Sequence, residues 1–278
     1  MNLKNIRTEF LKLSSFKPML FFFGAYIFSY CLYILIHETG HLIAFLIFGW
    51  NDAKISVTPF SGYTYKETYY FHSDIEKFLI FLAGPLFSLL CATIVFILFW
   101  HKRNPYLLPL FMYSSTVYLS EGIIIMNSLL DDTAIISDFD WLMALGLSPF
   151  IVAIISGVVL TIGFVITYLF WPLVEISPSD SFLRKLFINS GFIIYLILIV
   201  IFLPLFTPIV RTETKIFLNF IYLWYILFFL LRIALYRPVF PFIDRLTHTD
   251  VIEVSWFHVK YSLGLGFGIF IFLLFFFN

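Results

Sequence analysis

The residues with the clearest chemical meaning form an HExxH motif, His37-Glu38-Thr39-Gly40-His41. In a helix, residues four positions apart lie on the same face, so the two imidazoles can bind one metal ion together. Glu38 lies beside them, where a carboxylate can take a proton from metal-activated water. The spacing therefore predicts a zinc-dependent hydrolytic site, with His37 and His41 as metal ligands and Glu38 as the catalytic base.

The motif lies within a long apolar stretch of the chain. Residues 18–51 contain no Lys, Arg or Asp, and Glu38 is their only acid. Ionisable side chains inside a membrane are costly, and they occur where they pair, bind a metal or face water. A solvated helix face is the ordinary alternative for such a string in a soluble protein, and it does not suit these surroundings. We therefore interpret the motif as a functional site.

The composition of the whole chain is that of a membrane protein. Of its 278 residues, 61% are hydrophobic and only 12% are charged, which is far from the composition of a soluble domain. The 17 basic and 17 acidic residues balance, so the basic surface typical of nucleic-acid binding is not expected. We expect an integral, multi-pass protein of the cell membrane, in contact with the lipid bilayer and without a nucleic-acid partner.

The predicted fold class is an all-α polytopic membrane protein. A spanning helix needs about 20 mostly apolar residues, and the last apolar segment is short enough to be a partial or interfacial helix, so we predict six or seven transmembrane helices. Between the first two, residues 54–58 and 63–65 alternate around a Pro/Gly turn, which predicts a small β-hairpin. The predicted spans lie near residues 18–49, 78–100, 106–130, 149–172, 186–210, 216–236 and 261–277.

The order of crossing brings three distant segments to one side of the membrane. The two histidines lie roughly 6 and 12 Å beyond the middle of the first span, toward its exit, at about 1.5 Å per residue. The second span starts from that side, and Gly84 within it allows close backbone approach. The third span ends on that side too, and a stretch rich in Asp, residues 131–140, follows it.

That acidic stretch offers a third metal ligand. Catalytic zinc usually takes three protein ligands and leaves a fourth position for water. Residues 104–182 contain no Lys or Arg, so the acids there have no local cation, and a metal would neutralise them. An acidic loop wetted at the membrane surface is the alternative. The residues alone leave the choice open among Glu121, Asp131, Asp132, Asp138 and Asp140.

Three motifs together resemble the site-2 protease family of intramembrane zinc metalloproteases, over residues 18–145. They are the HExxH string, the sequence Ala-Gly-Pro-Leu-Phe-Ser that ends at Ser88, and Asn127 followed by an Asp. The chain departs from the family pattern in three places: Ser88 stands where the family has Asn, Asn127 lacks the Pro that follows it in the family, and Asp138 is followed by Phe139 rather than Gly.

The resemblance implies the identity of the ligands. In the family the two motif histidines and a later Asp hold Zn²⁺, and the motif Glu is the general base, which corresponds here to His37, His41 and Glu38. Asp138 matches the family's Asp best, with Asp132 as the alternative. A zinc peptidase of another type, in which Glu121 completes the site, is a further possibility.

The resemblance also implies an activity and a domain plan. The expected activity is hydrolysis of peptide bonds in membrane-embedded or membrane-proximal proteins, with a transmembrane protein or peptide as substrate. The alternative is a catalytically silent membrane scaffold or transporter that retains the protease fold. We expect a basic leader at residues 1–17, a zinc metalloprotease core of three spans, hairpin and Asp motif at 18–145, and additional transmembrane helices at 146–278.

Overall fold

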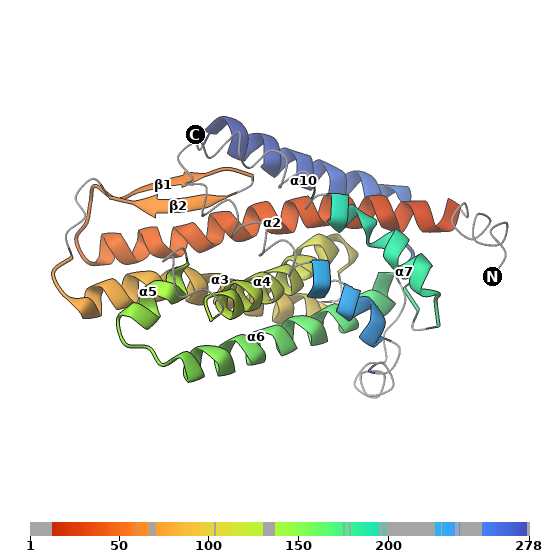
Figure 1. The fold of residues 1–278 in the computed structure, drawn as a ribbon. Coiled ribbons are helices and arrows are strands. Elements are labelled where there is room, and N and C mark those ends of the chain that lie inside the picture. The colour runs from red at the N-terminus through yellow and green to blue at the C-terminus, as the bar shows by residue number, and fades with distance from the viewer. Residues whose placement is uncertain are drawn as a thin grey trace.

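The computed structural model contains five helices that are long and apolar enough to cross a membrane, within the part of the chain that it describes (Figure 1). They are α2 (Leu13–Ile47), α3 (Asp74–Lys102), α4 (Leu108–Asn127), α6 (Pro149–Phe170) and α10 (Trp256–Phe276). The described residues are 13–59, 61–66, 71–102, 104–129, 137–174, 176–177, 179–194, 197, 226–228, 230–236, 239 and 252–276.

The predicted fold class is confirmed: a mainly helical membrane protein with a small hairpin between its first two spanning helices. The first four predicted spans correspond to α2, α3, α4 and α6. The last segment, for which a partial or interfacial helix was an option, belongs to α10, a helix of 21 residues. The predicted spans at 186–210 and 216–236 fall largely outside the described residues.

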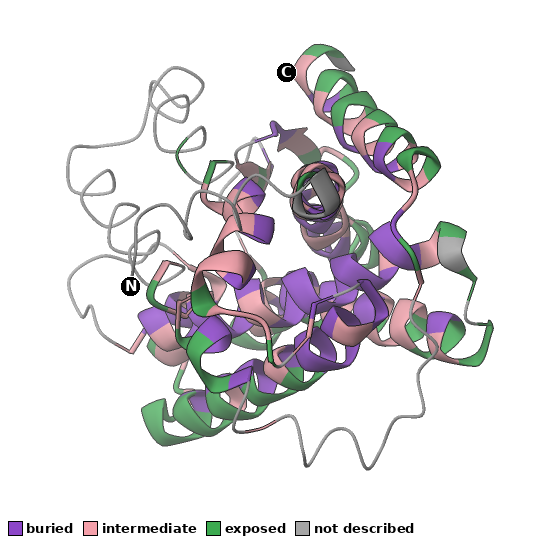
Figure 2. Cartoon of the chain, turned by 90° about the vertical axis from the view of Figure 1, so that its right-hand side faces the viewer, coloured by how far each residue is buried: buried purple, intermediate pink, exposed green. Residues whose placement is uncertain are grey.

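The outward faces of these helices are apolar, as a lipid environment requires. In a soluble protein the face away from the core is polar. Here α3, α6 and α10 instead expose rows of aliphatic and aromatic side chains at helical spacing. Figure 2 shows that the exposed residues lie on the outside of the bundle. Such a row on α6 comprises Ile151, Ile154, Val158, Ile162 and Val165.

Helix α4 forms the centre of the bundle, because it is buried along nearly its whole length between α2, α3 and α6. Small residues let α6 come close to it: a Cβ added to Gly163 would lie 2.9 Å from the Leu119 side chain. Polar contacts then join the two helices, including a 2.5 Å contact between the hydroxyls of Ser115 and Thr167. Close approach and interhelical hydrogen bonds are the usual means by which helices associate in lipid.

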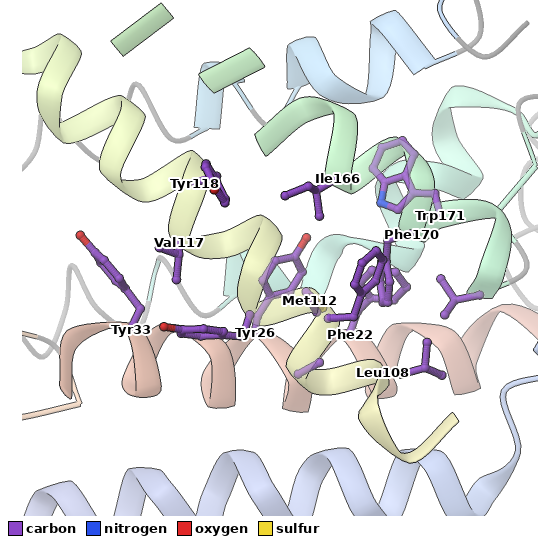
Figure 3. Packing of buried hydrophobic residues seen from close by; sticks show 14 of the residues in the cluster. Phe22, Tyr26, Tyr33, Leu108, Met112, Val117, Tyr118, Ile166, Phe170 and Trp171 are labelled. Carbon is purple, nitrogen blue, oxygen red and sulfur yellow. The ribbon is translucent and has the colours of Figure 1, made fainter. Parts of the chain in front are cut away.

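Aromatic side chains fill the space between α2, α4 and α6 (Figure 3). Phe22 of α2 meets Phe170 of α6 edge to face, with ring centroids 5.6 Å apart. The chain then continues through the short helices η2 (Trp171–Val174) and α7 (Phe182–Ile188), while η1 (Pro105–Leu107) precedes α4.

Helix α10 packs along α2 and runs in the same direction (Figure 1). The Ser262 hydroxyl donates to the Phe21 carbonyl at 2.7 Å. Glycine makes this approach possible, since a Cβ on Gly24 would lie 2.6 Å from the backbone nitrogen of Leu263. The helix that carries the HExxH motif is thus flanked by α3, α4 and α10.

The predicted hairpin consists of β1 (Lys54–Val57) and β2 (Gly62–Tyr65), paired antiparallel. It lies against the second half of α2, beside the HExxH motif (Figure 1). Its far end is anchored by Lys66, which is buried and places its ammonium 3.0 Å from the centre of the Trp50 ring. This cation–π contact fixes the exit of β2 to the end of α2.

Candidate metal centre

Three side chains from two helices converge on one point. His37 Nε2 lies 2.9 Å from Asp138 Oδ2, His41 Nε2 lies 3.2 Å from the same oxygen, and the two nitrogens are 3.2 Å apart. Tetrahedral zinc with ligand distances of about 2.0–2.1 Å separates its ligand atoms by about 3.3 Å. The triangle of atoms therefore has nearly the size that one coordinated ion requires, and these residues form a group able to hold a metal.

Helix α2 supplies the two histidines from successive turns of one face. Their ring centroids are 4.9 Å apart, and His41 is only 6% exposed. Thr39 between them donates its hydroxyl to the Leu35 carbonyl of the same helix at 2.7 Å, so it does not take part in the cluster.

The short helix α5 (Asp138–Ala144) supplies the carboxylate. Its N-terminus is a capping box: Ser137 Oγ accepts from the Asp140 amide at 3.2 Å, and Asp140 Oδ2 accepts from the Ser137 amide at 2.7 Å. The Ser137 hydroxyl also lies 2.5 Å from that of Ser128, at the end of α4. Asp140 is therefore engaged in the cap, while Asp138, the first residue of the helix, faces the histidines.

The environment of Asp138 favours its ionised form. Burial alone would raise the pKa of this carboxyl, but the positive charge of His41 and His37 in their protonated forms, together with hydrogen bonds from both rings, lowers the pKa well below its usual range. Asp138 is thus available as an anionic ligand. The other candidates from the same stretch, Asp131 and Asp132, lie outside the described residues.

The far nitrogens of both imidazoles are also held. His41 Nδ1 lies 2.7 Å from the Ile80 carbonyl oxygen, and His37 Nδ1 lies 2.8 Å from Glu121 Oε1. A hydrogen on Nδ1 that is donated outward leaves Nε2 free as the ligand atom, which is the arrangement typical of metal-binding histidines. The orientation of each ring thus suits a metal on the Asp138 side.

Glu121 does not lie among the three ligand atoms. It is fully buried on α4 and reaches His37 from the side opposite Asp138. Its Oε1 also lies 2.6 Å from the hydroxyl of Ser88, on α3. Glu121 is therefore a hydrogen-bond partner of His37 in this structure and does not belong to the group of three ligand atoms.

Gly84, where the sequence predicts close backbone approach, provides the space for His41. A Cβ at this position would lie 2.2 Å from His41 Nε2 and 2.6 Å from Cε1. The α3 backbone thus comes directly against the imidazole, at the point where a ligand atom is presented.

Glu38 lies next to the cluster, beneath the hairpin, and is 8% exposed. Thr64 of β2 donates its hydroxyl toward Glu38 Oε2 at 2.9 Å and lies at the same distance from the Glu38 carbonyl oxygen. Gly62 makes room for this approach, since a Cβ there would lie 2.6 Å from Glu38 Cγ. Thr64 was not singled out by the sequence, because no local pattern shows which helical residue a hairpin side chain will meet.

Two imidazoles and one carboxylate, with the outer imidazole nitrogens already hydrogen-bonded, are a ligand set that catalytic zinc commonly takes. The residues present thus fit a metal ion by their chemistry as well as by their spacing.

Comparison with known proteins agrees with this geometry. A family model described as peptidase family M50 matches residues 24–267, which is most of the chain and includes His37, Glu38, His41 and Asp138. No curated protein and no solved structure matched the chain. The chain belongs to peptidase family M50, the membrane metallopeptidases to which the site-2 proteases are assigned.

Proposed function

We propose that this protein is a zinc endopeptidase that cleaves membrane-embedded or membrane-proximal proteins within the cell membrane. The observation that carries the proposal is the meeting of Asp138 with His37 and His41, at 2.9 and 3.2 Å, beside the Glu38 carboxylate. Membership of a metallopeptidase family supports the same reaction class. The apolar outer faces of α3, α6 and α10 support a site enclosed by lipid.

The metal would be held by Nε2 of His37, Nε2 of His41 and Oδ2 of Asp138, as the distances among these atoms allow. Zinc bound there supplies a Lewis acid that polarises the substrate carbonyl and makes water acidic enough to attack near neutral pH.

Glu38 is the proposed general base. It takes a proton from the attacking water and passes that proton to the amine released from the peptide bond. The Thr64 hydroxyl lies 2.9 Å from Oε2, and this contact favours one orientation of the carboxylate. A fixed base is effective because proton transfer depends on a short, aligned approach.

The substrate must present an extended segment to this site. A membrane helix hides its peptide groups in internal hydrogen bonds, so it has to unwind before one of its peptide bonds can be attacked. The hairpin lies against α2 at Glu38 (Figure 1). An unwound segment that paired with an edge of the hairpin would be stabilised by backbone hydrogen bonds and would run next to the base.

Replacement of Glu38 by Gln tests the assignment. The amide has nearly the same shape but cannot accept the proton, so cleavage should fall by at least the factor of about 10²–10⁴ that general-base catalysis contributes. The assay is cleavage of single-span peptides in vesicles that contain the purified protein, followed by mass spectrometry. Zinc content should remain equal to that of the wild type, and cleavage at the wild-type rate by Glu38→Gln would refute the role of Glu38.

A matched control is available in the same region of the chain. Glu76 is also a buried acid, and it contacts the Trp50 indole and the His72 amide rather than the metal centre. Glu76→Gln should therefore leave cleavage and zinc content unchanged, apart from any change in stability. Asp138→Ala should lose zinc, which separates loss of the metal from loss of the base.

A further inference from the structure

The metal centre has a second carboxylate behind it, on the far side of His37. We infer that Glu121 is a positioning residue for His37, and that Ser88 holds Glu121 in place. The inference rests on the proposed function, because it concerns the metal that this function requires. Helices α2, α3 and α4 contribute His37, Ser88 and Glu121 in turn. Two contacts to Glu121, from His37 and from Ser88, therefore connect the three helices in one hydrogen-bond network.

The geometry at His37 determines what Glu121 does. The two ring nitrogens point to different carboxylates: Nε2 lies 2.9 Å from Asp138 Oδ2 and Nδ1 lies 2.8 Å from Glu121 Oε1. A neutral imidazole carries one hydrogen, and the nitrogen that binds a metal must be the one without it. With its hydrogen on Nδ1 donated to Glu121, His37 keeps Nε2 as the ligand atom and is prevented from rotating.

His41 provides an internal comparison. Its Nδ1 lies 2.7 Å from the Ile80 carbonyl oxygen, which is a neutral acceptor. Hydrogen bonds to an ionised acceptor are about twice as strong as neutral ones, and they make the imidazole a stronger ligand. The effect of Glu121 is therefore confined to His37, and its removal should alter one of the three ligand bonds.

The burial of Glu121 supports a role at the metal centre. Both Glu121 and Ser88 are 0% exposed, and Glu121 Oε2 has no hydrogen-bond partner among the described residues. A buried carboxylate is costly unless positive charge lies nearby, and residues 104–182 contain no Lys or Arg. His37 and the ion that it would bind provide positive charge within reach of Glu121.

Ser88 is the third member of this hydrogen-bond network. Its hydroxyl lies 2.6 Å from Glu121 Oε1 and 2.9 Å from the Pro85 carbonyl oxygen. A hydroxyl has a single hydrogen, and the shorter contact is the one to the carboxylate. Ser88 thus acts on His37 only through Glu121, and this dependence can be measured.

The test is the zinc affinity of the detergent-purified, full-length chain, measured by competition between Zn²⁺ and a chromogenic chelator. Loss of such an outer partner typically weakens metal binding 10- to 100-fold, and we expect this for Glu121→Ala. Glu121→Gln keeps an acceptor oxygen without the charge, so its loss should be smaller. Ser88→Ala should weaken binding in the wild type but have no further effect in a Glu121→Ala background. Glu76→Gln, the control acid away from the site, should bind zinc as the wild type does.

A second measurement separates positioning from a general loss of structure. Co²⁺ in place of zinc reports its ligand field through visible absorption, so the spectrum should shift in Glu121→Gln and remain unchanged in Glu76→Gln. If Glu121→Ala fails to fold, the nearly isosteric Glu121→Gln decides the question. Wild-type zinc affinity and an unshifted Co²⁺ spectrum in Glu121→Gln would overturn the inference and leave the proposed function intact. A wild-type protein that binds no zinc would overturn both.

Discussion

Alanine at position 84 would push a metal ligand out of place with a single methyl group. The added Cβ would lie 2.2 Å from His41 Nε2, whereas ordinary contacts of a Cβ begin at 3.4 Å. The imidazole must therefore withdraw by 3.4 minus 2.2, or about 1.2 Å, while metal sites accept ligand distances only within about 0.2 Å. The bond between His41 Nδ1 and the Ile80 carbonyl oxygen, at 2.7 Å, opposes such a movement.

We expect Gly84→Ala to lose zinc affinity by more than the 10- to 100-fold that loss of an outer partner produces, because a direct ligand is displaced. Cleavage should be lost together with the metal. The measurement is the zinc content per chain after a chelator wash of the purified protein, with thermal unfolding recorded on the same sample.

Gly157→Ala is the matched control for this substitution. A Cβ at Gly157, on α6, meets nothing within 4 Å. Alanine is favoured over glycine in a helix by about 1 kcal/mol, so this variant should be as stable as the wild type or slightly more so, with full zinc content. One zinc per chain at wild-type affinity in Gly84→Ala would refute the geometry that we assign to His41.

Two further pairs of variants examine the hairpin and helix α10. Thr64→Val removes a hydrogen bond to the Glu38 carboxylate, a bond to a charged group worth about 1.5–3 kcal/mol, so kcat should fall about 10- to 100-fold with KM and zinc affinity unchanged. Thr64→Ser should restore most of the rate, and equal defects in the two variants would contradict a positioning role. Gly24→Ala places a Cβ 2.6 Å from Leu263 N and should lower stability by about 1–3 kcal/mol without loss of zinc binding. Gly268→Ala, where a Cβ meets nothing within 4 Å, should be as stable as the wild type or slightly more so, and an equal loss of stability in both would speak against close packing of α2 on α10.

The features that depend on local geometry could be predicted from the sequence. Helical periodicity alone brings His37 and His41 to one face, and apolar length alone predicts α2, α3, α4 and α6. Alternation around a turn likewise predicts the hairpin. Each of these features needs only a short window of residues.

The choice of Asp138 over Asp140 as the third ligand depends on how the helix α5 begins. Ser137 and Asp140 have the spacing of a capping box, a local pattern that would have assigned Asp140 to the helix end and left Asp138 free. The sequence therefore contains a local signal that distinguishes Asp138 from Asp140.

Other contacts of the site depend on how elements rotate and dock. Which nitrogen of His37 faces Glu121 is determined by the rotation of α4 about its axis, and no periodicity encodes that angle relative to α2. The contact between Thr64 and Glu38 joins a strand to a helix across 26 residues of sequence. Such contacts follow from tertiary packing, which local propensity does not determine.

The docking of α10 on α2 bears on the order in which this protein becomes complete during synthesis. Ser262 and Phe21, which join the two helices, are 241 positions apart. Helix α2, which carries the motif, therefore leaves the ribosome well before α10. A nascent chain therefore carries its histidines on a helix whose flank toward α10 is not yet packed, and the packing around α2 is complete only after α10 has been inserted.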